Sequence, residues 1–279
     1  MRSLRKCKRG ELSTGRSQCP LDPANVIGAV VVEPGTVWPK DATASSLREA
    51  CHADRPDRIY PIMTFVEYAK EGGEVNVSAV GYGGNQVTSV GARTDTFTLD
   101  KFYPDMAASL SKAMNMPFEV FYFDMNNVVY GRRIGDDLRG FPINTLYPTV
   151  TPHPTSSNPA TLTVSFAFEN ARDAIEDFDF VELENLELKE ALTMLTEVEL
   201  VETATTGKYK IVEKVGGYDL TSRFAPIITE SATSVISGIS AASYDSDTET
   251  LSLTVTTGAT PALKAPSALY TAGIYGITG

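Results

Sequence analysis

The sequence has few of the residues that build disulfide frameworks, metal sites and general bases. Its 279 residues include only three cysteines, Cys7, Cys19 and Cys51, and only two histidines, His52 and His153. An odd, widely spaced set of cysteines argues against a disulfide scaffold and favours a reducing compartment during folding. Cys7 and Cys19 have no second pair and no adjacent histidine, so they do not suggest zinc. We expect His153 to lie in a surface loop and His52 to cap a helix or face solvent.

Sequence motifs of catalysis are missing as well. There is no Gly-x-Ser-x-Gly elbow, His-Glu-x-x-His helix, Walker loop or paired Cys-x-x-Cys. The glycines from Gly81 to Gly84 are not followed by a helix start with Lys-Ser or Lys-Thr, so they predict a loop tip. Asp245, Asp247 and Glu249 alternate as in a calcium loop but lack its glycine and distal glutamate, so they predict a turn. We therefore expect no catalytic, cofactor-binding or metal-binding residues, and a protein that is not an enzyme.

Long hydrophobic runs are also missing, and charge of one sign is in excess. No stretch of about 18 apolar residues occurs, so we expect no membrane-spanning helix. The basic N-terminal residues are followed by a polar stretch, Gly10 to Pro23, so no signal peptide is expected. The formal net charge is −11, and such a field disfavours tight nucleic-acid binding because it repels phosphates.

Length and composition favour two folded domains. Hydrophobic residues make up 42% of the chain, enough to bury a core without staples. We predict an N-terminal arm over 1–23, a β-rich domain over 24–188 and a second β domain over 189–279. The arm has no periodic pattern, and the sequence leaves open whether it is a disordered tail or docks on a neighbouring subunit.

The first domain is predicted to combine strands with two helices. Val26–Val32 is an apolar, β-branched run typical of a buried strand. Residues 41–53 predict a short helix, and residues 102–116 carry a one-sided apolar stripe that predicts a second one. Residues 118–130 predict two strands joined by an Asn-containing turn. Two further strands are expected over 138–150 and 161–168, separated by a loop rich in Pro, Ser and Thr.

Residues 59–99 predict an extended, partly polar β-arm. The runs 59–68 and 74–80 are separated by Gly72 and Gly73, which predicts a hairpin there. The second run alternates apolar and polar residues, and the glycine-rich stretch 81–85 predicts a flexible tip. Residues 94–99 alternate again and complete the arm.

Residues 169–190 are strongly acidic. Such a run is most often a solvated connector, and it places a domain boundary near Lys189. An alternative is a hydrolase that uses a carboxylate pair of this stretch, which predicts lost activity on changing Glu182 or Glu187. A site that cleaves sugars normally also needs exposed aromatic side chains, and the single tryptophan, Trp38, lies outside the run, so this alternative is less favoured.

The last 90 or so residues contain short strand candidates at regular spacing, separated by turn signals. This pattern predicts an immunoglobulin-like β-sandwich, and a carbohydrate-binding module is one function that such a sandwich supports. The strands are expected at 198–203, 209–215, 224–228, 234–240, 250–256 and near Ile274.

Three stretches resemble structural proteins of tailed bacteriophages, in particular major tail tube proteins of phages that infect Bacteroidetes-like hosts. The first is CKRG at Cys7, with TGRS at Thr14 and CPL at Cys19, followed by a hydrophobic strand. The second is YGRRIGDDLRGFPI, from Tyr130 to Ile143. The third is Val235–Leu253 together with APSAL and GIYG near the C-terminal end.

The resemblance implies a β-sandwich or open β-barrel with a flanking helix, which closes into stacked hexameric rings around a channel for double-stranded DNA. It also implies a location in the virion and, during assembly, in the host cytoplasm. Rings form when a heterologous contact closes, and edge strands such as 74–80 and 118–130 are candidates for pairing between subunits. An acidic lining lets DNA slide without adhering. A head-tail connector ring, a decoration protein and a fibre-base protein remain alternatives.

Overall fold

The computed structural model describes residues 2–3, 23–79, 81–156 and 159–279. Most of the predicted arm, including Cys7 and Cys19, lies outside these residues. The predicted mainly β class is confirmed, since 44% of the described residues lie in strands and 18% in helices. The chain divides into two compact units: residues up to Ala44 with Ile59–Leu192, and Ser45–Arg58 with Thr193–Gly279. No described helix is both long and apolar enough to cross a bilayer.

An eleven-stranded antiparallel sheet forms the first unit. One path runs β3-β2-β8-β11-β12-β7-β4, and β9 branches from β8 to pair with β10 and with β13, which in turn pairs with β1. The strands are β1 (Arg2–Ser3), β2 (Val26–Val32), β3 (Ile59–Met63), β4 (Phe65–Gly72), β7 (Arg93–Leu99), β8 (Phe118–Asp124), β9 (Val128–Ile134), β10 (Asp137–Arg139), β11 (Phe141–Thr151), β12 (Thr161–Phe168) and β13 (Phe178–Glu182).

Aromatic side chains fill the core of this sheet. Phe97, Tyr122 and Phe166 lie with ring centroids 5.1 to 6.0 Å apart, the spacing at which aromatic rings attract one another. The predicted second helix is confirmed as α2 (Pro104–Lys112), which packs Met106 and Leu110 against this cluster.

One of the two stretches expected to offer a free edge, 118–130, lies inside the sheet. All seven residues of β8 are buried, and the strand pairs with β2 on one side and with β11 and β9 on the other. The run 118–130 is therefore no edge for pairing between subunits, because its backbone donors and acceptors are already used within the sheet.

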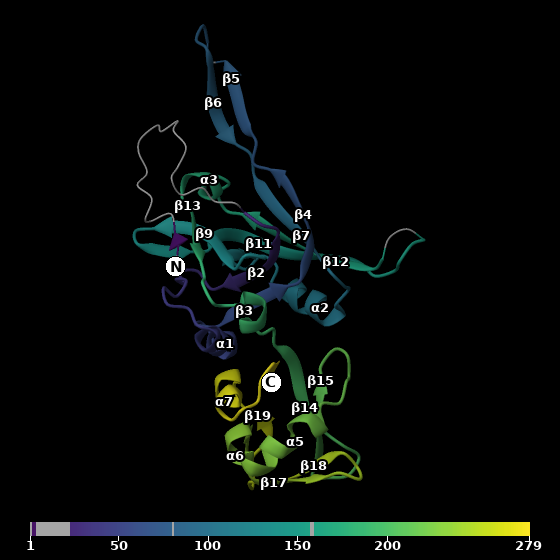
Figure 1. The fold of residues 1–279 in the computed structure, drawn as a ribbon. Coiled ribbons are helices and arrows are strands. Elements are labelled where there is room, and N and C mark those ends of the chain that lie inside the picture. Colours follow the sequence, from purple (N-terminus) through teal and green to yellow (C-terminus); the bar gives the residue numbers. More distant parts are fainter. Residues whose placement is uncertain (1, 4–22, 80, 157–158) are drawn as a thin grey trace. The chain divides into compact units, whose positions relative to one another are not determined.

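The β-arm is present, but its pairing differs from the predicted hairpin at Gly72 and Gly73. Strand β4 pairs with β7, and β5 (Val75–Ala79) pairs with β6 (Asn85–Val90), so the chain runs through the two glycines and reverses beyond Ala79. Figure 1 shows β5 and β6 extending away from the body of the sheet as a two-stranded ribbon, which we call the outer ribbon.

The acidic run 169–190 is not the predicted solvated connector. It contains α3 (Asp173–Glu176), β13 and α4 (Leu188–Ala191), and β13 pairs with β9 inside the large sheet. The two units divide at Leu192 and Thr193.

The second unit is a five-stranded sheet in the order β17-β18-β15-β14-β20, with helices packed on it. The predicted strand at Phe224–Ile228 is wrong, because these residues lie in helix α5, so a helix takes the place of one strand of the expected sandwich. The elements are β14 (Thr196–Glu202), β15 (Lys208–Glu213), α5 (Thr221–Glu230), α6 (Ala232–Val235), β16 (Ile236–Ser237), β17 (Ile239–Asp245), β18 (Thr250–Val255), β19 (Ala262–Leu263), α7 (Pro266–Thr271) and β20 (Ile277–Thr278).

The predicted first helix is confirmed as α1 (Ala44–His52), but it completes the second unit. His52 is 1% exposed, so of the two expectations for it, exposure to solvent is wrong, whereas its ring does bond a carbonyl oxygen in the last turns of α1, that of Arg48. Cys51 is also fully buried, and its Sγ accepts a hydrogen bond from Thr193 N at 3.4 Å. A segment between two strands of the first unit thus supplies buried residues to the second.

Candidate assembly interface

A buried ion pair fixes the base of the β-arm. Asp95 of β7 is 1% exposed, and Arg93 donates to both of its carboxylate oxygens, from Nε at 2.9 Å and from Nη2 at 2.8 Å. Tyr68 of β4 donates from Oη to Asp95 Oδ1 at 3.2 Å. The Arg93 guanidinium also lies 4.8 Å from the centroid of Phe168. A bidentate pair of this kind is strong and directional, so both strands leave the sheet from a rigid base.

The pKa of the Tyr68 hydroxyl reflects this setting. Burial raises it above the ordinary value, and the negative charge of Asp95 raises it further, while Arg93 opposes the shift. Tyr68 therefore stays protonated and keeps donating to Asp95.

Two glycines shape the junction between the base and the outer ribbon. Gly72 and Gly73 have φ of +69° and +78°, a region that residues with a side chain rarely adopt. A Cβ on Gly72 would lie 1.9 Å from the carbonyl oxygen of Ala92. The ladder continues across the junction through Gly73 N to Ala92 O at 2.9 Å and Gly91 N to Glu74 O at 2.8 Å.

The outer ribbon carries no charge although it is exposed, and its apolar side chains alternate with polar ones. From Val75 to Ala92 the sequence has no charged side chain. Within the described residues, β5 pairs only with β6, so each strand has one open edge. Such ribbons are marginally stable alone, and natural proteins usually protect open edges with charges or proline. The exposed apolar side chains are Val75 at 51%, Val77 at 52%, Val87 at 57% and Tyr82 fully exposed.

A second surface, which we call the hydroxyl face, lies on the side of four paired strands opposite the aromatic core. Successive side chains of a strand alternate between faces, so the register that turns Phe97 and Phe166 into the core turns their neighbours to the opposite side, where Thr96 and Thr98 are half-buried and Ser165 is 4% exposed. Thr96 and Ser165 lie opposite each other with their Oγ atoms 2.8 Å apart. The members of the face are Thr94, Thr96 and Thr98 of β7, Thr163 and Ser165 of β12, and Tyr147 and Thr149 of β11.

Charges are sorted between the two sides of this sheet. Glu67 and Glu71 of β4 pair with Thr98 and Thr94, so they belong to the hydroxyl face. Lys70 pairs with Asp95, and Arg93 pairs with Gly72, so both cations belong to the opposite side. Within these strands the hydroxyl face carries carboxylates and no cation.

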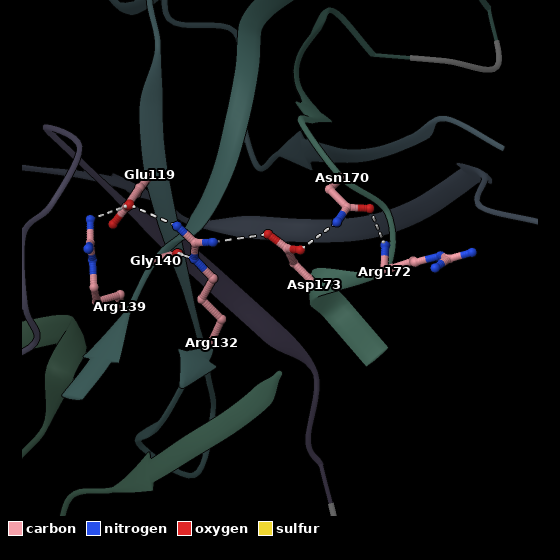
Figure 2. Close-up of polar contacts among 7 residues, drawn as sticks. All are labelled: Glu119, Arg132, Arg139, Gly140, Asn170, Arg172 and Asp173. Atoms are coloured by element: carbon pink, nitrogen blue, oxygen red, sulfur yellow. Dashed lines mark hydrogen bonds and ion pairs between the residues drawn. The ribbon is translucent and has the colours of Figure 1, made fainter. Parts of the chain in front are cut away.

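A separate polar cluster ties the acidic run to the YGRRIGDDLRGFPI stretch. Figure 2 shows Arg132 between Glu119 and Asp173, with Nη2 3.2 Å from Glu119 Oε1 and Nη1 3.1 Å from Asp173 Oδ2. Arg139 donates to the same Glu119 oxygen at 2.7 Å, and Asn170 donates to Asp173 at 2.8 Å. Each carboxylate is held by guanidinium or amide donors, an arrangement that stabilises the fold rather than prepares proton transfer.

The remaining sequence candidates lie apart from one another. His153 is exposed in the loop after β11, as expected for a surface histidine. Asp245 forms the predicted turn, accepting from Asp247 N at 3.1 Å and pairing with Lys208 at 2.7 Å. Glu182 is half-buried in β13 and Glu187 is exposed before α4. Among the residues that the structure describes, no cluster of His, Cys, Asp and Glu is arranged to hold a metal ion.

The hydroxyl face was missed in the sequence, although its signal is there. TDTFT at Thr94 and TLTVS at Thr161 both place hydroxyls at every second position, which a strand turns to one side. Compared with known proteins, the chain matches no family model and none of the curated proteins.

Proposed function

We propose that this chain is a non-enzymatic structural protein of a tailed-phage virion, which assembles with copies of itself into stacked rings of a tail tube. The observation that carries the proposal is the outer ribbon. It projects from a rigid base, exposes valines and a tyrosine, and has two open strand edges without a charge to protect them. A neighbouring copy that covers this ribbon buries apolar area and pairs free backbone groups, and both effects favour association.

The hydroxyl face supports a role in conducting DNA. A polyanion adheres to a protein mainly through lysine and arginine, which release its counterions. A face of hydroxyls and carboxylates without cations offers no lysine or arginine to the phosphates of double-stranded DNA. We propose that this face lines the channel of the assembled tube, while the outer ribbon contacts the next ring.

The sorting of charge also favours a conduit over a DNA-binding role. The cations of the same strands lie on the opposite side, where Arg93 is paired with the buried Asp95. The overall formal charge of −11 agrees in sign. Long-range repulsion by such a surface acts against binding rather than for it.

Negative-stain electron microscopy of the purified full chain tests the proposal. We expect rings or tubes. A continuous helical polymer supports the tube, a single ring supports a connector, and a stable monomer at high concentration overturns both.

Paired substitutions test whether the outer ribbon makes the contact. Val75→Asp with Val87→Asp places charges on the ribbon and is expected to abolish assembly while the fold stays intact. Val201→Asp with Val255→Asp is the matched control, because these valines are 39% and 37% exposed in the second unit. Equal assembly of the two double variants contradicts the assignment of the ribbon.

A further inference from the structure

His52 is buried and uses both ring nitrogens. It lies at the end of α1, where Nδ1 is 2.6 Å from the carbonyl oxygen of Arg48 and Nε2 is 3.1 Å from the backbone N–H of Gly276. A carbonyl only accepts, so Nδ1 carries the proton, and Nε2 accepts from Gly276. The rings of Tyr270 and Tyr275 lie 4.7 and 6.1 Å from the imidazole. The site is therefore built for the neutral form.

Gly276 links His52 to the edge of the five-stranded sheet. Its N–H is held by His52, and its carbonyl oxygen accepts from Thr196 N at 3.0 Å. The residues that follow form β20, in which Ile277 pairs with Thr196 and Thr278 with Glu197. Strand β20 pairs with one end of the outer edge of β14. The bond from His52 therefore positions the peptide that directly precedes β20.

We propose that His52 is a proton-sensitive latch: a second proton on its imidazole breaks the bond to Gly276 and releases β20 from the edge of β14. The proton binds at Nε2, whose lone pair is then no longer an acceptor. Two N–H groups would face each other in a buried site, and at least one would be left without a partner. The peptide of Gly276 is thereby pushed away from α1.

On balance, the surroundings of the imidazole act against its protonated form. Burial lowers the pKa of His52 most, and the positive charge of Arg58 lowers it further, while the bond to the Arg48 carbonyl opposes the shift. Cys51, beside it on α1, is a neutral thiol whose pKa is raised to about 11. The carboxylate of Asp54 accepts a hydrogen bond from Ser267 Oγ at 2.6 Å, and the rings of Tyr270 and Tyr275 lie beside the imidazole.

The sign of the effect follows from this environment. A released His52 regains its ordinary pKa of about 6.5 and binds more protons below that pH than the latched one. The latch is therefore fully closed above about pH 6.5. As the pH falls below this value, the ratio of latched to released molecules decreases by up to about tenfold per pH unit. Acid opens a strand edge, and an open edge is a surface on which another chain can pair.

Amide hydrogen exchange measured by mass spectrometry tests the latch in the full chain, at about pH 7.5 and about pH 5.5 with correction for the intrinsic rate. We expect peptides that cover 272–279 and 194–198 to lose about tenfold in protection at the lower pH. His52→Gln keeps an acceptor and does not titrate, so its protection is expected to be equal at both values. His153→Gln removes the other, exposed histidine and is expected to respond as the natural sequence does.

Protection that does not change with pH, or an equal change in His52→Gln, overturns the proposal. A second measurement needs no substitution and holds even if His52→Gln fails to fold. Exchange of the imidazole C2 hydrogen reports the titration of each histidine separately, and the midpoint of His52 is expected to lie below the ordinary histidine value of about 6.5. A midpoint at or above about 6.5 also overturns the proposal. The proposal does not depend on assembly, so it stands or falls separately from the virion role.

Discussion

Arg132 Nη1 lies 3.1 Å from Asp173 Oδ2, which is 41 positions further along the chain. The two side chains are 19% and 12% exposed. This pair brings the basic motif of β9 against the acidic run and neutralises charge that would otherwise be costly to bury. Asp179 repeats the arrangement with Arg133 at 3.1 Å. The acidic run is therefore folded into the first unit because the sheet holds its counter-charges.

Removal of Glu119 is expected to destabilise the first unit. Glu119→Ala leaves Arg132 and Arg139 without their shared acceptor in a site where the glutamate is 3% exposed. Breaking such a pair costs about 2 to 4 kcal/mol of the free energy of unfolding. Urea denaturation followed by the fluorescence of Trp38 measures it, because Trp38 is the single tryptophan and is buried in this unit. The exposed Glu169→Ala is the control, and equal unfolding midpoints would contradict the expectation.

The junction of the arm is expected to tolerate no side chain. Gly72→Ala places a Cβ 1.9 Å from the Ala92 carbonyl at a φ of +69°, so the local ladder has to shift, at a cost of about 1 to 3 kcal/mol. Amide exchange over 73–92 is expected to accelerate and assembly to fail. Gly84→Ala is the matched control in the same arm, because its Cβ meets no atom within 4 Å and its φ is not positive. If both variants behave alike, the junction has no special role.

Labelling of cysteines tests whether the hydroxyl face lines the channel. In a Cys7→Ser, Cys19→Ser background, Thr96→Cys in assembled tubes is expected to react with a small maleimide but not with one carried on a bulky protein. Thr254→Cys, an exposed threonine on β18 of the second unit, is expected to react with both. If Thr96→Cys reacts with the bulky reagent, the face lies outside the tube, and if it reacts with neither reagent, the face is buried between subunits.

Cys51 is expected to be unreactive in the folded protein. Burial raises the pKa of its thiol to about 11, so at about pH 8 roughly one molecule in a thousand carries the thiolate that reacts. In the Cys7→Ser, Cys19→Ser background, a disulfide reagent is expected to modify no thiol in native conditions and one thiol in denaturant. Rapid native labelling would show that α1 does not stay docked in the second unit.

The second unit is expected to need α1. A fragment spanning 193–279 lacks Cys51, His52 and Asp54, which bond to Thr193, Gly276 and Ser267. We expect this fragment to give poorly dispersed amide NMR spectra, and a fusion that restores residues 45–58 through a flexible linker to give dispersed ones. A well-folded fragment 193–279 would contradict the role of α1.

Strong local patterns in the sequence located several elements correctly. Strand β2 spans Val26–Val32 as predicted, and α1 and α2 lie within the predicted ranges. These segments were identifiable because burial of one face imposes a period that is visible within a single element. The error at α5 arose from β-branched residues. Thr221, Phe224, Ala225 and Ile228 have helical spacing and are buried together, so the pattern for a helix was present but was given less weight than local propensity.

By itself, the sequence determined the mainly β class, the two early helices, the uncharged outer ribbon and the lack of recognisable catalytic motifs, because each depends on composition or on a pattern within a short window. Only the tertiary structure decided which strands pair across Gly72, where the acidic run finds its arginines, which side of the sheet carries the hydroxyls, and that His52 reaches Gly276. These relationships join residues far apart in the chain, and strand register, which one residue of slip would invert, sets which side chains share a face. The free energy of burial that fixes such contacts is decided by the whole core rather than by any one segment.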